Sequence, residues 1–158
     1  RTATVTVTIA GDNVIEPDET FFVNLTNATN AIITDAQGQG TIRNDDTPNL
    51  TINSVSANEG RSGTKNYSFR VSLSFAASVD VTVGYATADG TATAPSDYTS
   101  TSGTITIPAG VRTATINVSV VCDASVEPDE TFFVNLSNAT NAVITVAQGQ
   151  GTIRNDDL

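Results

Sequence analysis

The sequence predicts an all-β fold, and two observations lead to this prediction. Apolar and polar residues alternate through most of the chain, which is the period-two pattern of half-buried strands, and no stretch of useful length has a helical period. Residues 49–158 contain seven such segments, separated by turns rich in Gly, Pro, Asn and Asp. Seven short alternating segments in one domain length are typical of a two-sheet antiparallel β-sandwich of immunoglobulin-like type.

One stretch of the sequence occurs twice. Residues 112–157 repeat residues 1–46 without a gap at an offset of 111 positions, with 34 of the 46 positions identical and 12 different. We therefore expect residues 1–46 to be the C-terminal part of one repeat, residues 47–48 a linker, and residues 49–158 a complete domain.

The first copy is expected to supply only the last three strands of a repeat, at residues 1–10, 21–25 and 36–43. Pro17 blocks strand pairing, so the acidic residues around it should lie in a loop. Three strands cannot close a sandwich, which would leave their apolar face open. Two explanations remain: another chain completes the unit by strand exchange, or the sequence is an excerpt of a longer array.

The complete unit is expected to contain seven strands, at residues 50–56, 67–73, 79–85, 105–107, 114–120, 132–136 and 147–154. The clearest is the second, in which Tyr67, Phe69, Val71 and Leu73 alternate with polar residues. A long Thr-, Ala- and Ser-rich loop, residues 89–98, follows the third strand.

The charge and composition exclude several classes of protein. A net charge of −10, from 17 acidic and 7 basic residues, argues against nucleic-acid binding, which needs Lys and Arg. The single cysteine, Cys122, allows no intrachain disulfide, and without histidine a structural zinc site is not expected. The sequence has no apolar run long enough to predict a membrane-spanning helix. Abundant Thr, Ser and Asn with scarce Lys are common in secreted bacterial surface proteins, so we expect an extracellular or cell-surface location.

The acidic residues of the complete unit fall in loops that should share one end of the sandwich. Loops after the first, third and fifth strands meet at the same end, and the seventh strand finishes there. These positions hold Glu59, Asp97, the 123–130 segment with its four acids, and finally Asp156 and Asp157. Oxygen ligands in flexible loops suit Ca²⁺, which takes six to eight of them, better than Mg²⁺. The alternative is that the clusters are solvated surface charge.

Several motifs in order resemble a Calx-β domain, a module of sodium–calcium exchangers, integrin β4 and many bacterial surface proteins. They are NEG (58–60), ATADGTATAPSDYT (86–99), GTITIPAG (103–110), EPDETF (127–132) and RNDD (154–157). The resemblance covers residues 49–158, with residues 1–46 as a partial copy. It implies a seven-stranded sandwich that binds calcium at one tip.

The resemblance also implies which residues bind the metal. In the complete unit they are Glu59, Asp97, Asp123, Glu127, Glu130, Asp156 and Asp157; in the first copy they are Asp12, Glu16, Glu19, Asp45 and Asp46. Cys122 and Gly11 depart from the exchanger pattern, where an aspartate pair begins, and Asn155 and Asn44 replace the first of three closing aspartates. Fewer carboxylates imply one or two ions per domain and weaker binding. Asp129 and Asp18 are expected to point outward as surface charge.

The function expected from these observations is a calcium-binding structural or adhesive repeat in a tandem extracellular array or filament. Calcium at the tip would stiffen the joints between neighbouring repeats, which are the expected partners. Two alternatives remain: a calcium-sensing regulatory module, and a strand-exchanging filament subunit or homo-oligomer without a functional calcium site. The sequence shows no catalytic arrangement; Asp123 and Glu127 lack the aromatic-lined cleft of a glycosidase.

Overall fold

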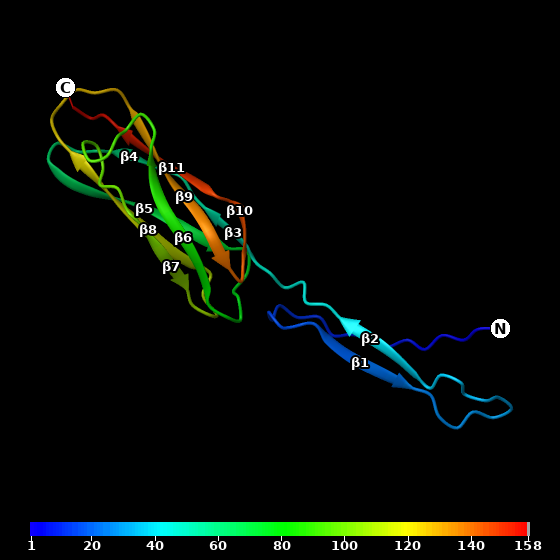
Figure 1. The fold of residues 1–158 in the computed structure, drawn as a ribbon. Coiled ribbons are helices and arrows are strands. Elements are labelled where there is room, and N and C mark those ends of the chain that lie inside the picture. The colour runs from blue at the N-terminus through cyan, green and yellow to red at the C-terminus, as the bar shows by residue number, and fades with distance from the viewer. Residues whose placement is uncertain (158) are drawn as a thin grey trace. The chain divides into compact units, whose positions relative to one another are not determined.

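The computed structural model describes residues 1–157 of the chain, and these form strands and no helix. The all-β prediction is confirmed. The chain divides into two compact units, residues 1–46 and the part from residue 47 onward, which are described separately below (Figure 1). Within the described residues there is no helix long and apolar enough to cross a membrane.

The first unit contains one antiparallel hairpin, β1 (Glu19–Asn24) with β2 (Gln37–Ile42). Phe21 pairs with Gly40, and its ring occupies the space that a side chain at Gly40 would need. The complete unit repeats this arrangement with Phe132 over Gly151. Gly40 and Gly151 are therefore the positions where an aromatic ring of the neighbouring strand lies over the backbone.

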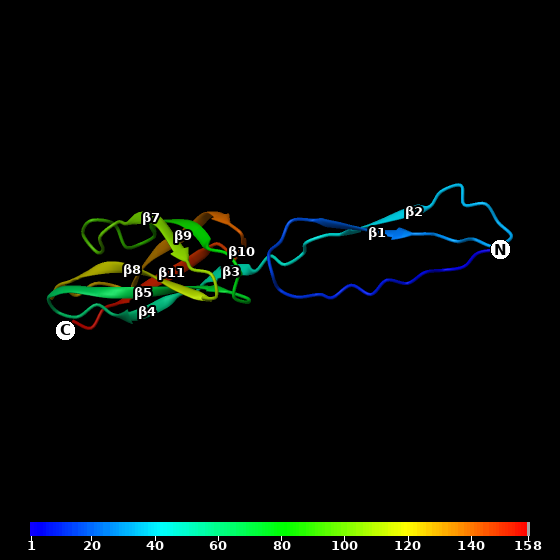
Figure 2. The ribbon, with the colours of Figure 1, turned by 90° about the horizontal axis from the view of Figure 1, so that it is seen from below.

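The predicted strand at residues 1–10 is wrong. These residues are exposed and form no strand, and Figure 2 shows them (dark blue) as a trace without an arrow. Their counterpart in the complete unit is β8 (Thr113–Cys122), which is antiparallel to β5 (Gly63–Leu73) along ten residue pairs. The first unit has no copy of β5, so the alternating pattern of residues 1–10 has no partner with which to form a ladder.

The complete unit is a sandwich of two sheets with strand orders β10-β3-β5-β8 and β4-β11-β9-β6-β7. Figures 1 and 2 show that the strand axes of the two sheets are roughly aligned, with arrows pointing both ways along that axis. Besides β5 and β8, the two sheets contain β3 (Asn49–Ile52), β4 (Val55–Asn58), β6 (Val81–Asp89), β7 (Ser102–Ile107), β9 (Glu130–Thr140), β10 (Val143–Val146) and β11 (Gln148–Arg154).

The first and last strands each divide between the two sheets, which gives nine segments where seven strands were predicted. The chain leaves one sheet after β3 and enters the other as β4, and it does the same from β10 to β11. β3 is parallel to β10 and β4 is parallel to β11, so two parallel pairs complete an otherwise antiparallel sandwich. At the crossing, Gly149 lies so close to the Asn53 carbonyl that no side chain fits between them.

The core is centred on aromatic rings near the acidic end of the unit. Tyr98 stacks on Phe132 with ring centroids 4.6 Å apart, and Phe69 meets Phe132 edge-on at 5.8 Å. All three side chains are buried. Tyr98 ends the long loop predicted at residues 89–98, so this stack fastens the loop to the body of the sandwich and gives the loop a defined position.

Candidate metal centre

The predicted loops meet at one tip of the complete unit. β4, β6, β8 and β11 all end there, while β5 and β9 begin there (Figure 1). Antiparallel pairing alternates strand direction, and the parallel pair β4–β11 ends at the same side. The alternation of strand direction expected from the sequence therefore places these loops at the same end as the structure does.

Three carboxylates converge at this tip. Asp97, Glu127 and Glu130 each place one oxygen so that all three oxygens lie within 4.8 Å of one another, and all three side chains are half-buried. Burial raises the pKa of Glu130, and the charges of Asp97 and Glu127 raise it further. A divalent cation among these oxygens would relieve this repulsion.

The loop that carries Asp97 is held by hydrogen bonds to its own backbone and to β8. The Asp97 carboxylate accepts from the Thr93 amide at 2.7 Å and the Thr93 hydroxyl at 3.2 Å. The Asp97 carbonyl accepts from the amide of Val121 at 2.9 Å. The Tyr98 hydroxyl donates to Asp89 at 2.6 Å, and this bond lowers the pKa of Asp89. These contacts fix the position of Asp97 at the tip.

A second group of acids, Glu59, Asp156 and Asp157, lies at the same tip. Glu59 is 7% exposed and Asp157 is 6% exposed. Burial raises the pKa of Glu59 to about 7, helped by four nearby carboxylates, those of Asp123, Glu127, Asp157 and Asp156. The two groups therefore act on each other electrostatically and form one acidic centre.

The two carboxylate oxygens of Asp157 are in different environments. Its Oδ1 is 3.3 Å from Nε of Arg61, but its Oδ2 is buried and no donor among residues 1–157 reaches it. A buried carboxylate oxygen without a partner is costly unless a cation or donor reaches it. Together with the three converging oxygens, this orphaned atom indicates that the residues of the tip fit a metal ion.

Asp156 is already engaged with the turn that follows β4. Its Oδ1 accepts from the Gly60 amide at 3.0 Å, and its Oδ2 accepts from the Asn58 side chain at 3.4 Å. Gly60 has a φ of +90°, a conformation that suits glycine. Asp156 thus connects the NEG turn to the closing segment and keeps Glu59 beside Asp157.

Cys122, which stands where the exchanger pattern has an aspartate, has a structural contact instead. Its thiol is buried and donates to the Glu59 carbonyl at 2.7 Å. Burial raises the pKa of the Cys122 thiol, which keeps it protonated and unreactive. The thiol adds no carboxylate to the tip and instead holds the backbone of Glu59 in place.

Asp129 and Asp18 are exposed, as expected for surface charge, but each also makes a structural hydrogen bond. Asp129 accepts from the Asn155 amide at 3.2 Å, and in the first unit Asp18 accepts from the Asn44 amide at 3.0 Å. Both bonds tie the EPDE loop to the closing segment. The sequence signal for this role was available: both members of each pair are identical in the two copies.

The closing segments have the same turn in both copies. The Asn155 side chain accepts from the Asp157 amide at 3.1 Å, and that of Asn44 accepts from the Asp46 amide at 3.2 Å. Such side-chain-to-backbone turns need an acceptor oxygen, which asparagine supplies without adding charge. Asparagine at these two positions therefore forms the turn without adding a charge to the segment.

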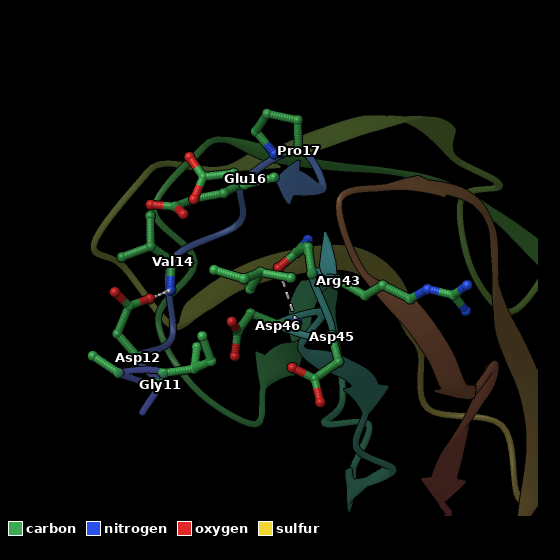
Figure 3. Close-up of a pocket in the computed structure, with 13 residues that line it drawn as sticks. Gly11, Asp12, Val14, Glu16, Pro17, Arg43, Asp45 and Asp46 are labelled. Carbon is green, nitrogen blue, oxygen red and sulfur yellow. Dashed lines mark hydrogen bonds between the residues drawn. The ribbon is translucent and has the colours of Figure 1, made fainter. Parts of the chain in front are cut away.

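All five metal ligands predicted in the first unit line one pocket of about 230 Å³. Figure 3 shows Asp12 and Glu16 on one segment across from Asp45 and Asp46 on the other, while Arg43 extends away. Glu19 also contributes to the lining. Glu59 and Asp97 have no counterpart in residues 1–46, so this pocket has a smaller set of carboxylates than the tip of the complete unit.

The fold is similar to solved structures of Calx CBD domains. The apo form of the Calx CBD1 domain has a TM-score of 0.64 and 26% sequence identity, with 70% of this chain and 99% of that chain covered. The structure described as the calcium binding domain CBD12 of CALX1.1 has a TM-score of 0.61 and 25% identity, covering 68% and 46%.

Curated relatives are similar over a shorter stretch. Mouse sodium/calcium exchanger 1 is 44% identical over 61 residues, which is 39% of this chain and 6% of the exchanger. Mouse sodium/calcium exchanger 3 is 39% identical over 67 residues, which is 42% of this chain and 7% of the exchanger. The chain thus spans less than a tenth of the relatives it matches.

The Calx-beta domain family matches the chain twice, over residues 1–46 and 45–157. The two matched segments contain the acidic loops of the two units and the whole of the sandwich. The chain belongs to the Calx-beta domain family.

Proposed function

We propose that the complete unit binds Ca²⁺ at its acidic tip. The convergence of Asp97, Glu127 and Glu130, with one oxygen of each within 4.8 Å of the others, carries this proposal. The buried, unpartnered Oδ2 of Asp157 supports it independently. A similar solved structure is described as a calcium binding domain, which favours the same ion.

The seven carboxylates expected from the sequence are the residues that would hold the ion. Bound Ca²⁺ supplies two positive charges and accepts six to eight oxygen ligands, which suits loops that offer carboxylates and carbonyls. Glu59 and Asp157 offer buried oxygens, and Asp97, Glu127 and Glu130 offer half-buried ones. The ion would convert mutual repulsion among these groups into attraction to one centre.

The role we propose is structural: a repeat of a tandem extracellular array, in which calcium stiffens the joints between neighbouring repeats and serves adhesion or filament formation. Two adjacent family matches support the tandem arrangement, and a solved tandem CBD12 structure offers a parallel in another protein. The Thr-, Ser- and Asn-rich composition supports a surface location.

A calcium-sensing regulatory module is the second candidate, and the similarity to sodium/calcium exchangers favours it. The two roles differ in the affinity they need. A structural extracellular module binds calcium with a dissociation constant of roughly 10⁻⁴–10⁻³ M, whereas a sensor binds at about 10⁻⁷–10⁻⁵ M. Calorimetric titration of the whole chain therefore separates them.

Calcium binding is tested with the double variant Glu127→Gln and Glu130→Gln. Its calcium affinity is measured by calorimetry and its melting temperature by thermal unfolding. We expect wild type to gain melting temperature with Ca²⁺ and the double variant to lose most of this gain, because a ligand stabilises only the state it binds. Asp80→Asn is a single-charge control just before β6, away from the tip, since asparagine can still accept from the Ala109 amide. Equal calcium response in all three proteins would refute the proposal.

A further inference from the structure

One cation of the complete unit contacts a carboxylate of the acidic centre. Arg61 lies in the turn between β4 and β5, and its Nε is 3.3 Å from Oδ1 of Asp157. The two side chains are in opposite environments: that of Arg61 is 67% exposed and that of Asp157 is 3% exposed. A largely solvent-exposed cation therefore meets a buried anion at the edge of the candidate metal centre.

The other polar contacts of Asp157 leave its charge largely unbalanced. Its backbone amide donates to Asn155, and its second carboxylate oxygen is buried without a donor. Glu59 lies close enough for its pKa to be raised by the charge of Asp157. A buried charge among like charges is strongly unfavourable unless a counter-charge is present.

We propose that Arg61 is the built-in counter-cation of this centre: it neutralises Asp157 when calcium is absent and is displaced when calcium binds, so it lowers the calcium affinity of the complete unit. This inference rests on the proposed function and assigns Arg61 the role of a residue that sets affinity without being a ligand. The guanidinium and a calcium ion compete for the same carboxylate, and the two cations repel each other at close range.

The exposure of Arg61 makes displacement feasible. Two thirds of its side chain is already in water, so the guanidinium gives up little burial when it leaves. The turn that carries it contains Gly60 at a φ of +90° and Gly63 at +82°, and both are conformations in which glycine is favoured.

Lys65 and Arg70 are cations of the same unit that form no ion pair with the acids that the structure describes. The Lys65 ammonium group donates to the Asn58 carbonyl at 2.7 Å, close to the tip but on a neutral acceptor. Arg70 is farther along β5, opposite Thr115 of β8. Replacing either by glutamine changes the net charge as Arg61→Gln does. Lys65→Gln therefore controls for a charge change near the tip, and Arg70→Gln controls for the change in net charge of the whole chain.

The experiment measures calcium affinity by calorimetry, and melting temperature in chelator and in Ca²⁺, for the whole chain. We expect Arg61→Gln to bind calcium about tenfold more tightly than wild type and to melt at a lower temperature in chelator, because Asp157 has lost its counter-charge. Arg61→Lys should lie near wild type in both measurements. Lys65→Gln and Arg70→Gln should change affinity less than threefold.

Unchanged or weaker calcium binding by Arg61→Gln would overturn the inference, and so would an equal gain in all three glutamine variants. If Arg61→Gln folds only with calcium, its affinity follows from the calcium dependence of folding, and this outcome supports the counter-cation role. Failure to fold in both conditions would show a purely structural role and overturn the inference. Absence of calcium binding by wild type would instead refute the proposed function.

Discussion

At the scale of single residues, the tip contains a carboxylate whose protonation is coupled to folding. Glu59 is buried among acids, and its pKa of about 7 compares with an ordinary value of 4.5. The folded protein therefore holds this proton more tightly than the unfolded chain does. Glu130 shifts in the same direction for the same reasons, burial first and then the charges of its neighbours.

We expect the stability of the calcium-free protein to fall as the pH rises from 4.5 to 7. The contribution of Glu59 is full below its unfolded pKa and is lost as the pH passes its folded pKa, a loss of roughly 2–3 kcal/mol for a shift of this size. Urea denaturation in chelator at pH 5, 6 and 7.5 measures it.

Calcium and the variant Glu59→Gln provide the controls. A bound cation favours the ionised form, so the fall in stability should be weaker with Ca²⁺ than with chelator. Glu59→Gln cannot titrate and should have a flatter profile in chelator. A slope as steep in this variant as in wild type would show that another group controls the pH dependence.

At the scale of elements, β11 begins with a close backbone contact to the segment between β3 and β4. β10 and β11 belong to different sheets, and Gly149 sits just after the crossing, against the carbonyl of Asn53. The first copy has Gly38 in the same sequence position, at the offset of 111, with nothing within 4 Å of a Cβ built there. A side chain is therefore excluded at this position in the complete unit but has room in the first unit.

We expect Gly149→Ala to destabilise the complete unit by about 1–3 kcal/mol, since the methyl group forces backbone apart. Gly38→Ala is the matched control and should leave stability nearly unchanged, because its Cβ meets open space. Chemical denaturation of both variants in calcium measures the difference. A similar loss in the two variants would mean that strand conformation, and not the crossing, explains the glycine.

At the scale of the molecule, the two units carry acidic sites of unequal size. The first has five of the predicted ligands around one pocket, while the complete unit has seven, including Glu59 and Asp97 from loops that residues 1–46 lack. Cation affinity in such sites rises with the number of charged ligands. The tighter calcium site should therefore belong to the complete unit.

Paired substitutions test this ranking. We expect Asp156→Asn with Asp157→Asn to remove the tighter phase of a calcium titration, and Asp45→Asn with Asp46→Asn, the matched positions of the first unit, to leave it in place. Both pairs change the net charge by two. Loss of the tighter phase from the first-unit pair would reverse the ranking, and loss from neither would place the site elsewhere.

Much of the fold could be predicted because its signals are local. Alternation located β5, β6 and β8, turn residues located the loops, and strand parity brought Glu59, Asp97 and Asp157 to one end. Pairing is not local: residues 1–10 alternate as well as their counterparts do, yet they form no strand without a β5 beside them. The division of β3 from β4 has the same origin, since neither segment alone indicates which sheet it joins.

The sequence by itself therefore determined the all-β class, the family and the acids that gather at the tip, because these depend on residue type and order. Only the tertiary structure decided that Asp157 is buried with one oxygen unpartnered, that Arg61 faces it, and that Asp129 ties two loops together. Burial and charge balance depend on which distant segments surround a side chain, and no local pattern encodes those surroundings.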